Sequence, residues 1–338
     1  MIIIKYPILK KNSTVGVTAP SSGIGEGFQS WLVASKKRLE RDGFQVITGE
    51  TAWTQEKARS APAQKRAAEL QMMMEDQNID LIIPPRGGEL VIEILEELDF
   101  SKFTPKWILG FSDLSVLLLA ITLKTGIATA HGPNLVDMRG EISDETTAMW
   151  QEVLATKEGG SVVQYASKKY QKIRKYDDPP PWVFNLTEST KWKVLSGKDV
   201  EITGRLLGGC IDVIRHLVGT PFGDVAKYLD LFSKGESIIW YFENYDMNNA
   251  ELRRSLVQMR YAGWFERCAG FLFGRGVDIA LYDYHAIDVY RELAAELKVP
   301  IVYDIDCGHL PPQLTLVNGA FGKVVVNGDE ESVTQFFI

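Results

Sequence analysis

The sequence predicts a two-domain α/β protein with a parallel sheet in its first half. Three observations support this fold class. The chain has 338 residues, which is more than one hydrophobic core ordinarily organises. Apolar strand-like runs alternate with segments of helical spacing between residues 14 and 125, as is typical of a parallel sheet covered by helices. The second half mixes strand and helix signals.

The expected elements of the first half alternate from one end to the other. Strands are expected at 14–19, 44–48, 81–83 and 107–109. Helices are expected after Phe28 with an end before Gly43, at 62–75, after Gly88, and at 113–125. Sites in such sheets form at the carboxyl ends of the strands, where Gly88 and Ser112 stand.

The rest of the chain divides into a connector and a second domain. We expect an N-terminal domain at 1–165, an ordered connector with few regular elements at 166–199, and a C-terminal domain at 200–338. The triple proline at 179–181 precludes a helix in the connector. In the C-terminal domain, strands are expected at 200–205, 237–242, 269–273, 301–303 and 323–327, and helices at 209–218, 249–262 and 285–297.

Composition excludes several classes of protein. The net charge is −7 and no long Lys/Arg block occurs, so nucleic acid is not expected as a partner. Three widely spaced cysteines predict neither a disulfide framework nor a zinc site. The first apolar run is too short for a signal peptide, and the run 116–121 is far short of the roughly 20 residues that span a bilayer. A cytoplasmic enzyme with no membrane contact is expected.

Ser112 is the candidate nucleophile. An apolar strand-like run reaches Gly110, Ser112 follows, and a helix-like run begins at once, which is the layout of a nucleophile elbow. The alternative is that Ser112 or Asp113 caps the next helix. Ser115 is a rival nucleophile inside that helix. Leu114 stands where an ordinary α/β-hydrolase has a second glycine, which disfavours that class.

A serine needs a base, and the chain has four histidines. His309 follows the expected strand 301–303, with Gly308 before it and two prolines after it, so its loop can hold the ring in one geometry. A structural loop histidine is the alternative. The other three lie in a loop after a short strand, inside an amphipathic helix, and at a helix start: His131, His216 and His285.

Two further groups complete a possible hydrolytic site. Glu243 ends the apolar strand 237–242, where its carboxylate can accept the imidazole Nδ1–H. A surface glutamate is the alternative, and Asp246 is a competing acid. The backbone N–H of Gly88 and that of Asp113 are candidates for an oxyanion hole, although a Gly-Gly pair is also a common turn.

Taken together, these pieces resemble a known family. Gly-Phe-Ser112-Asp, Arg86-Gly-Gly88, the run 204–209, Phe-Glu243-Asn, Gly274-Arg275 and Gly308-His309 are similar to the LD-carboxypeptidase family of serine peptidases, which includes the microcin C immunity proteins. The likeness covers roughly residues 14–322. It implies a flavodoxin-like N-terminal domain that carries the serine, and a C-terminal α/β domain with a barrel-like sheet that carries the glutamate and the histidine.

The resemblance also implies roles for individual residues. Ser112 would be the nucleophile, His309 the base and Glu243 the group that orients the base. The amides of Gly88 and Asp113 would form the oxyanion hole. A cytoplasmic homodimer without a metal or nucleotide cofactor is implied as well.

Two departures favour the microcin C immunity branch. Members that trim murein tetrapeptides often continue the Gly-Gly turn with Tyr-Gly, whereas this chain continues with Glu89. The long connector holds Trp182 and Trp192, and in that branch a connector tryptophan stacks on the nucleotide part of a peptidyl-nucleotide. Such stacking contributes about 1–3 kcal/mol per base. Anchoring of the connector is the alternative role for both tryptophans.

The sequence therefore predicts a serine carboxypeptidase or amidase. Its expected substrate is a peptidyl-nucleotide of the microcin C type, as in self-immunity, and a murein peptide is the alternative. Arg86 is the candidate partner of a terminal carboxylate, with a structural ion pair as the alternative, and Glu89 is a further candidate contact. A non-catalytic binding protein on the same fold is disfavoured because all three triad residue types are present. A nucleotide-dependent enzyme is disfavoured because the chain has no phosphate-binding loop.

Overall fold

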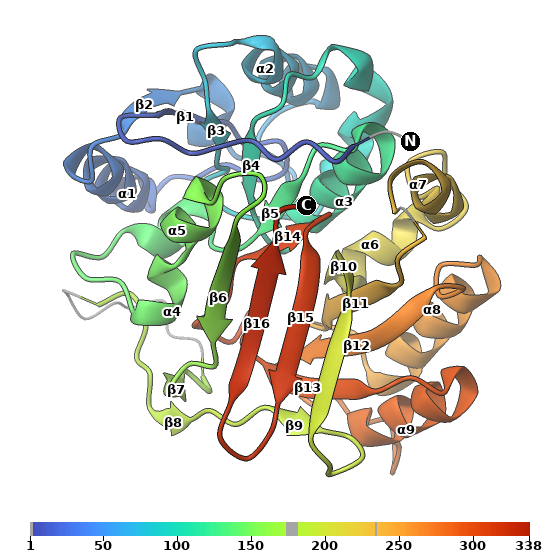
Figure 1. Ribbon diagram of the computed structural model, residues 1–338. Coiled ribbons are helices and arrows are strands. Elements are labelled where there is room, and N and C mark those ends of the chain that lie inside the picture. Colours follow the sequence, from blue (N-terminus) through green and yellow to red (C-terminus); the bar gives the residue numbers. More distant parts are fainter. Residues whose placement is uncertain (1–2, 174–181, 234) are drawn as a thin grey trace.

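The computed structural model describes residues 3–173, 182–233 and 235–338, and two large sheets organise them (Figure 1). The first sheet has six strands in the order β14 (Leu316–Asn318), β5 (Thr129–His131), β4 (Trp107–Gly110), β3 (Leu81–Ile82), β1 (Thr14–Val17) and β2 (Gln45–Thr48). Strands β1 to β5 are parallel in the order 2-1-3-4-5, which is that of flavodoxin-like sheets. Strand β14 closes one edge in antiparallel pairing with β5. The predicted α/β fold class is confirmed.

The second sheet has eight strands and is mixed. Its order is β6 (Ser161–Tyr165), β16 (Glu331–Phe336), β15 (Phe321–Val326), β10 (Val200–Cys210), β11 (Ile238–Glu243), β12 (Cys268–Gly274), β13 (Ile301–Ile305) and β9 (Lys193–Val194). Strands β10 to β13 are parallel, and the strands on either side of them are antiparallel. The division of the chain at 165 and 199 and the barrel-like closure of this sheet stay predictions.

Helices cover both sheets. In the first half these are α1 (Gln29–Arg41), α2 (Ala63–Glu75), the 3-10 helix η2 (Val91–Glu97) and α3 (Leu114–Thr125). In the second half they include α6 (Ile211–Ile214), η5 (Arg215–Leu217), α7 (Val225–Phe232), α8 (Asn249–Tyr261) and α9 (Ala286–Leu297). In the ranges that the structure describes, no helix is long and apolar enough to cross a membrane.

Helix α3 lies at the junction of the two sheets (Figure 1). Every residue from Leu114 to Leu123 is buried, and only Lys124 and Thr125 at the end of the helix reach solvent. It packs against β5 of the first sheet and against β10 of the second. A helix that is apolar all round must be covered on all sides, and α3 therefore joins the two halves of the chain into one core.

The start of the C-terminal half differs from the prediction. The sequence predicts a strand at 200–205 and a helix at 209–218, whereas β10 continues to Cys210 and only α6 and η5 follow it. The reason is close approach of other segments to the glycines. A Cβ on Gly208 would lie 1.8 Å from the carbonyl oxygen of Tyr241, and one on Gly209 would lie 2.6 Å from Cβ of Ser115. The glycines thus permit strand pairing and α3 packing rather than starting a helix.

Trp192 anchors the connector. Its side chain is 1% exposed, and its indole N–H donates to the Asp306 carboxylate over 2.8 Å. The same buried carboxylate accepts from the backbone N–H and the hydroxyl of Ser167 and pairs with Arg275. A side chain so buried has no face for a substrate base, and Trp192 instead has its alternative role, anchoring the connector. The triple proline at 179–181 lies outside the described residues.

This anchor can be tested with Trp192→Phe. The substitution removes the indole N–H and leaves one buried carboxylate oxygen of Asp306 with fewer donors, which costs about 1–3 kcal/mol. We expect the free energy of unfolding in urea to fall by that amount. Substrate affinity should not change, and a large loss of affinity with unchanged stability would instead return Trp192 to the binding site.

Candidate active site

Ser112 occupies a strained turn between β4 and α3. Its φ is 65°, in the left-handed region that non-glycine residues seldom adopt. A serine in this conformation, between a buried strand and a helix, is typical of a nucleophile elbow. The prediction of an elbow at this position therefore agrees with the backbone geometry.

A chain of hydrogen bonds joins the three predicted residues. Ser112 Oγ lies 3.1 Å from Nε2 of His309, and Nδ1 of His309 lies 2.7 Å from Oε2 of Glu243. The backbone N–H of His309 also donates to that oxygen, over 3.1 Å. Ser112 follows β4, Glu243 ends β11, and His309 follows β13, so the chain of bonds joins both sheets. The arrangement has the geometry of a serine, a general base and the acid that orients it.

The carboxylate of Glu243 is buried, with 1% of the residue exposed. Burial by itself raises the pKa of a carboxyl group, but the charge of His309, its hydrogen bonds and the nearby His131 outweigh burial, and the pKa of Glu243 falls below its usual value. The group is therefore ionised near neutral pH. An ionised carboxylate at this position can stabilise an imidazolium ion on His309.

Gly308 makes the approach of His309 to Glu243 possible. Its φ is 101°, and a Cβ at this position would lie 2.1 Å from Oε2 of Glu243. Only glycine combines this conformation with the space that is present.

Two aromatic rings hold the imidazole of His309. Tyr245 stacks on it with ring centroids 4.0 Å apart, and Phe111 meets it edge to face at 5.0 Å. The turn that carries Tyr245 is in turn held by Asp212. Its carboxylate accepts backbone N–H groups from Tyr245, Asp246 and Met247 over 2.8–3.2 Å.

Tyr245 and Asp212 were missed as site residues in the sequence. The position of Tyr245 two residues after Glu243 was the available signal, whereas Asp212 lies in the first turn of α6, distant in sequence, and carries no local signal. The competing acid Asp246 is exposed in the same turn. The rival nucleophile Ser115 is fully buried and its hydroxyl accepts the N–H of Cys210, so neither alternative joins the chain of bonds.

The glycine pair lies directly beside the serine. A Cβ on Gly87 would lie 2.7 Å from Cβ of Ser112, and Gly88 has a φ of 154°. Among the described residues, no acceptor takes a hydrogen bond from the N–H of Gly88 or from that of Asp113. Both amides therefore stay candidates for the oxyanion hole.

The other histidines lie away from Ser112. His285 caps α9, where its ring bonds to Asp278 over 2.8 Å, and His216 lies in η5. His131 is fully buried behind the site, with Nδ1 3.9 Å from the sulfur of Cys307. Within the described ranges, no group of three His, Cys, Asp or Glu side chains is arranged to hold a metal ion.

The site opens into a cleft of about 230 Å³. Arg86 and Glu89 are exposed at its edge, and in the part of the chain that the structure describes Arg86 forms no ion pair. Trp182 is 46% exposed but does not line the cleft, although its neighbours Val183 and Phe184 do. The lining of the cleft also includes side chains that the sequence did not single out for binding: Phe28, Trp31, Asn134 and Arg139.

Two family models match this chain. Residues 15–132 match the LD-carboxypeptidase N-terminal domain, and residues 203–324 match the LD-carboxypeptidase C-terminal domain. The microcin C7 self-immunity protein MccF of Escherichia coli is 24% identical over 99% of this chain and 97% of its own length. A probable murein peptide carboxypeptidase of Bacillus subtilis is 25% identical over 97% of this chain and 93% of its own length.

Solved structures with the same fold have lower identity. An MccF-like protein from Bacillus anthracis superposes with a TM-score of 0.84 at 20% identity, over 98% of each chain. MccF in complex with glutamyl sulfamoyl guanosine superposes with a TM-score of 0.81 at 19% identity, over 99% of this chain and 98% of that one. These likenesses establish the fold.

The buried His131 predicts acid sensitivity. Burial lowers its pKa to about 4, whereas an unfolded histidine titrates near ~6.5. Below about pH 6.5 His131 is therefore protonated in the unfolded chain but stays neutral in the folded one. The free energy of unfolding falls as the pH drops toward 4. We expect His131 to lower the free energy of unfolding by about 2 kcal/mol between about pH 7.5 and about pH 5.

Urea unfolding of the wild type and of His131→Gln at both pH values measures this contribution. The glutamine variant should lose the part of the pH dependence that His131 causes. An equal loss of stability in both proteins would show that other groups cause the acid sensitivity.

Proposed function

The chain belongs to the LD-carboxypeptidase family, and we propose that it hydrolyses an amide bond with Ser112 as nucleophile, His309 as base and Glu243 as orienting acid. The observation that carries the proposal is the continuous chain of hydrogen bonds from Ser112 Oγ through the His309 ring to the buried Glu243 carboxylate. The family is one of serine-type carboxypeptidases, and this geometry suits acyl transfer through a serine.

Each step of the proposed reaction uses a contact of the site. Nε2 of His309 takes the hydroxyl proton of Ser112 while Oγ attacks the amide carbonyl. The resulting oxyanion accepts hydrogen bonds from the amides of Gly88 and Asp113. His309, charged and facing the Glu243 carboxylate, then gives its proton to the leaving amine. Water, activated by the same histidine, hydrolyses the acyl-enzyme and restores Ser112.

The proposed substrate is a small peptidyl-nucleotide. The 24% identity to a microcin C7 self-immunity protein over nearly the whole of both chains supports this choice. Exposed Trp182, beside two residues that line the cleft, remains a candidate to stack on a base. The similarity to a murein peptide carboxypeptidase supports the second candidate, a murein tetrapeptide.

Arg86 and Glu89 are the proposed polar contacts at the edge of the cleft. Arg86 adjoins the glycine pair and could receive a terminal carboxylate, and Glu89 could receive an amino group of the substrate. We further propose a cytoplasmic homodimer, in keeping with the family resemblance. Light scattering in solution should then give twice the chain mass of 37.9 kDa.

Ser112→Ala tests the nucleophile. Hydrolysis of an LD-linked murein tetrapeptide and of aspartyl sulfamoyl adenosine should be measured for the wild type and the variant. We expect kcat for the cleaved substrate to fall on the order of 10⁴–10⁶-fold, because the acyl-enzyme cannot form.

Ser115→Ala is the matched control, since it removes a serine hydroxyl three residues further along α3. It should retain activity within about tenfold, the range of a lost structural hydrogen bond. Full activity in Ser112→Ala would refute the serine mechanism. Cleavage of the tetrapeptide alone would replace the first proposed substrate by the second.

Arg86→Ala tests recognition of a terminal carboxylate. Loss of a charge-assisted hydrogen bond costs about 1.5–3 kcal/mol, so KM for a substrate with a free carboxyl terminus should rise roughly 10- to 100-fold with kcat little changed. The same substrate with an amidated carboxyl terminus is the control, and its KM should be insensitive to the substitution. An equal effect on both substrates would remove Arg86 from this role.

A further inference from the structure

We propose that Arg66 is a positioning residue for the oxyanion hole, because it ties together the two segments that hold Gly88 in place. The inference rests on the proposed function, in which the amide of Gly88 donates to the oxyanion. Arg66 itself lies on α2 and does not line the cleft.

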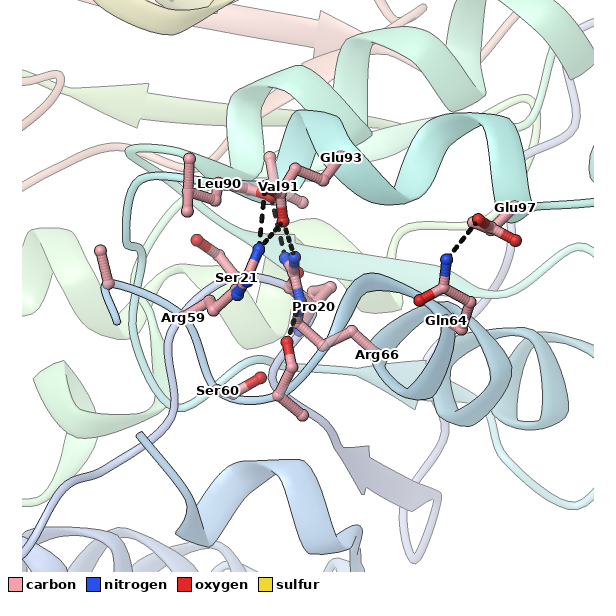
Figure 2. A network of polar contacts seen from close by, with 12 residues as sticks. Pro20, Ser21, Arg59, Ser60, Gln64, Arg66, Leu90, Val91, Glu93 and Glu97 are labelled. Atoms are coloured by element: carbon pink, nitrogen blue, oxygen red, sulfur yellow. Dashed lines mark hydrogen bonds and ion pairs between the residues drawn. The ribbon is translucent and has the colours of Figure 1, made fainter. Parts of the chain in front are cut away.

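Arg66 is fully buried, and most of its guanidinium N–H groups donate to backbone carbonyls. Nη1 donates to the carbonyl oxygen of Pro20 over 2.7 Å and to that of Leu90 over 2.9 Å, and Nε donates to Ala61 over 2.8 Å. Nη2 pairs with the carboxylate of Glu93. Figure 2 shows the guanidinium between the segment of Pro20 and that of Leu90.

Both segments touch Gly88 or its turn directly. A Cβ on Gly88 would lie 2.3 Å from Oγ of Ser21 and 2.4 Å from Oγ of Ser22, so its backbone lies against that loop with no spare room. The N–H of Ser22 donates to the carbonyl of Gly87 over 3.3 Å. Pro20 immediately precedes this loop, and its carbonyl is one of the two that Arg66 holds.

The segment after the turn is fixed in the same way. Leu90, whose carbonyl Arg66 also holds, follows Gly88 by two residues. The next residue, Val91, donates its N–H to the Asp113 carboxylate over 2.8 Å, and Ser21 donates its hydroxyl to the same carboxylate. Asp113 supplies the second proposed oxyanion donor. Arg66 and Asp113 thus bind the same pair of segments.

The charge of Arg66 is balanced within the network. Glu93 accepts from Arg66 and also from Nη1 of Arg59, over 2.8 and 2.9 Å. Since an unpaired buried charge is strongly destabilising, Glu93 allows Arg66 to stay charged in the interior. The planar guanidinium reaches three carbonyls and a carboxylate at once, which the single ammonium of a lysine cannot do in the same geometry.

Displacement of Gly88 should impair the transition state more than substrate binding. The hydrogen bond to the oxyanion forms only as the carbonyl is attacked, so it affects kcat and not ground-state affinity. Removing an oxyanion donor outright costs about 10²–10³-fold in kcat. A donor that is displaced but still present should cost less than that.

Arg66→Met and Arg66→Lys test the inference in the full-length protein. Aspartyl sulfamoyl adenosine and the LD-linked tetrapeptide serve as substrates, and a fluorophosphonate reports the reactivity of Ser112 by mass spectrometry. We expect kcat and the rate of labelling to fall roughly 10- to 100-fold in Arg66→Met, with KM within about twofold of the wild type. Arg66→Lys should show the same split with a smaller loss in kcat.

Arg253→Met is the matched control. Arg253 also bridges helices, through ion pairs to Glu292 and Glu296, but it lies on α8 away from the cleft. It should lower stability without changing kcat. The inference is overturned if Arg66→Met or Arg66→Lys keeps kcat within about twofold of the wild type, or if KM and kcat change in parallel.

The experiment separates a folding defect in Arg66→Met and a failure of the proposed function from a failure of the inference itself. If Arg66→Met does not fold, Arg66→Lys decides by the same criteria. If Ser112→Ala is as active as the wild type, the proposed function fails and the inference fails with it. An inactive Ser112→Ala beside a fully active Arg66 variant overturns the inference alone.

Discussion

The structure depends on the burial of helix α3 between the two sheets. Ten successive residues of this helix, Leu114 to Leu123, are buried, and the helix contacts both β5 and β10. Because water is excluded from these ten residues, their burial stabilises the contact between the halves as well as each half. Ser112 stands at the start of α3, so the same packing brings the serine to the strand ends of the second sheet.

The second sheet contributes a buried carboxylate, that of Glu243, to the site. Glu243 ends β11 inside the protein, where an unpaired carboxylate would be costly. Oε2 of Glu243 accepts two hydrogen bonds from His309. This approach is possible because Gly308 has no side chain to clash with the carboxylate. The same hydrogen bonds therefore stabilise the buried carboxylate and orient the imidazole. Tyr245 and Phe111 restrict the ring from its other sides.

Close packing around glycines explains where the sequence was read correctly and where it was not. Gly87 and Gly88 were predicted to lie at the nucleophile because they follow a strand, and they do. A helix was predicted to begin at Gly209, but Gly208 and Gly209 continue β10 because Tyr241 and Ser115 approach too closely for any side chain. The two pairs have the same local pattern, and the difference lies in neighbours that are distant in sequence.

The sequence by itself determined the order of strands and helices in the first half and the presence of a serine, a glutamate and a histidine at separate strand ends. These features follow from short-range periodicity and from where apolar runs stop. Only the tertiary structure decided that Glu243 rather than Asp246 faces His309, that Trp192 is an anchor, and that Arg66 holds the loops around Gly88. Such contacts join residues far apart in the chain, often through backbone carbonyls, which are the same at every position and leave no mark in the sequence.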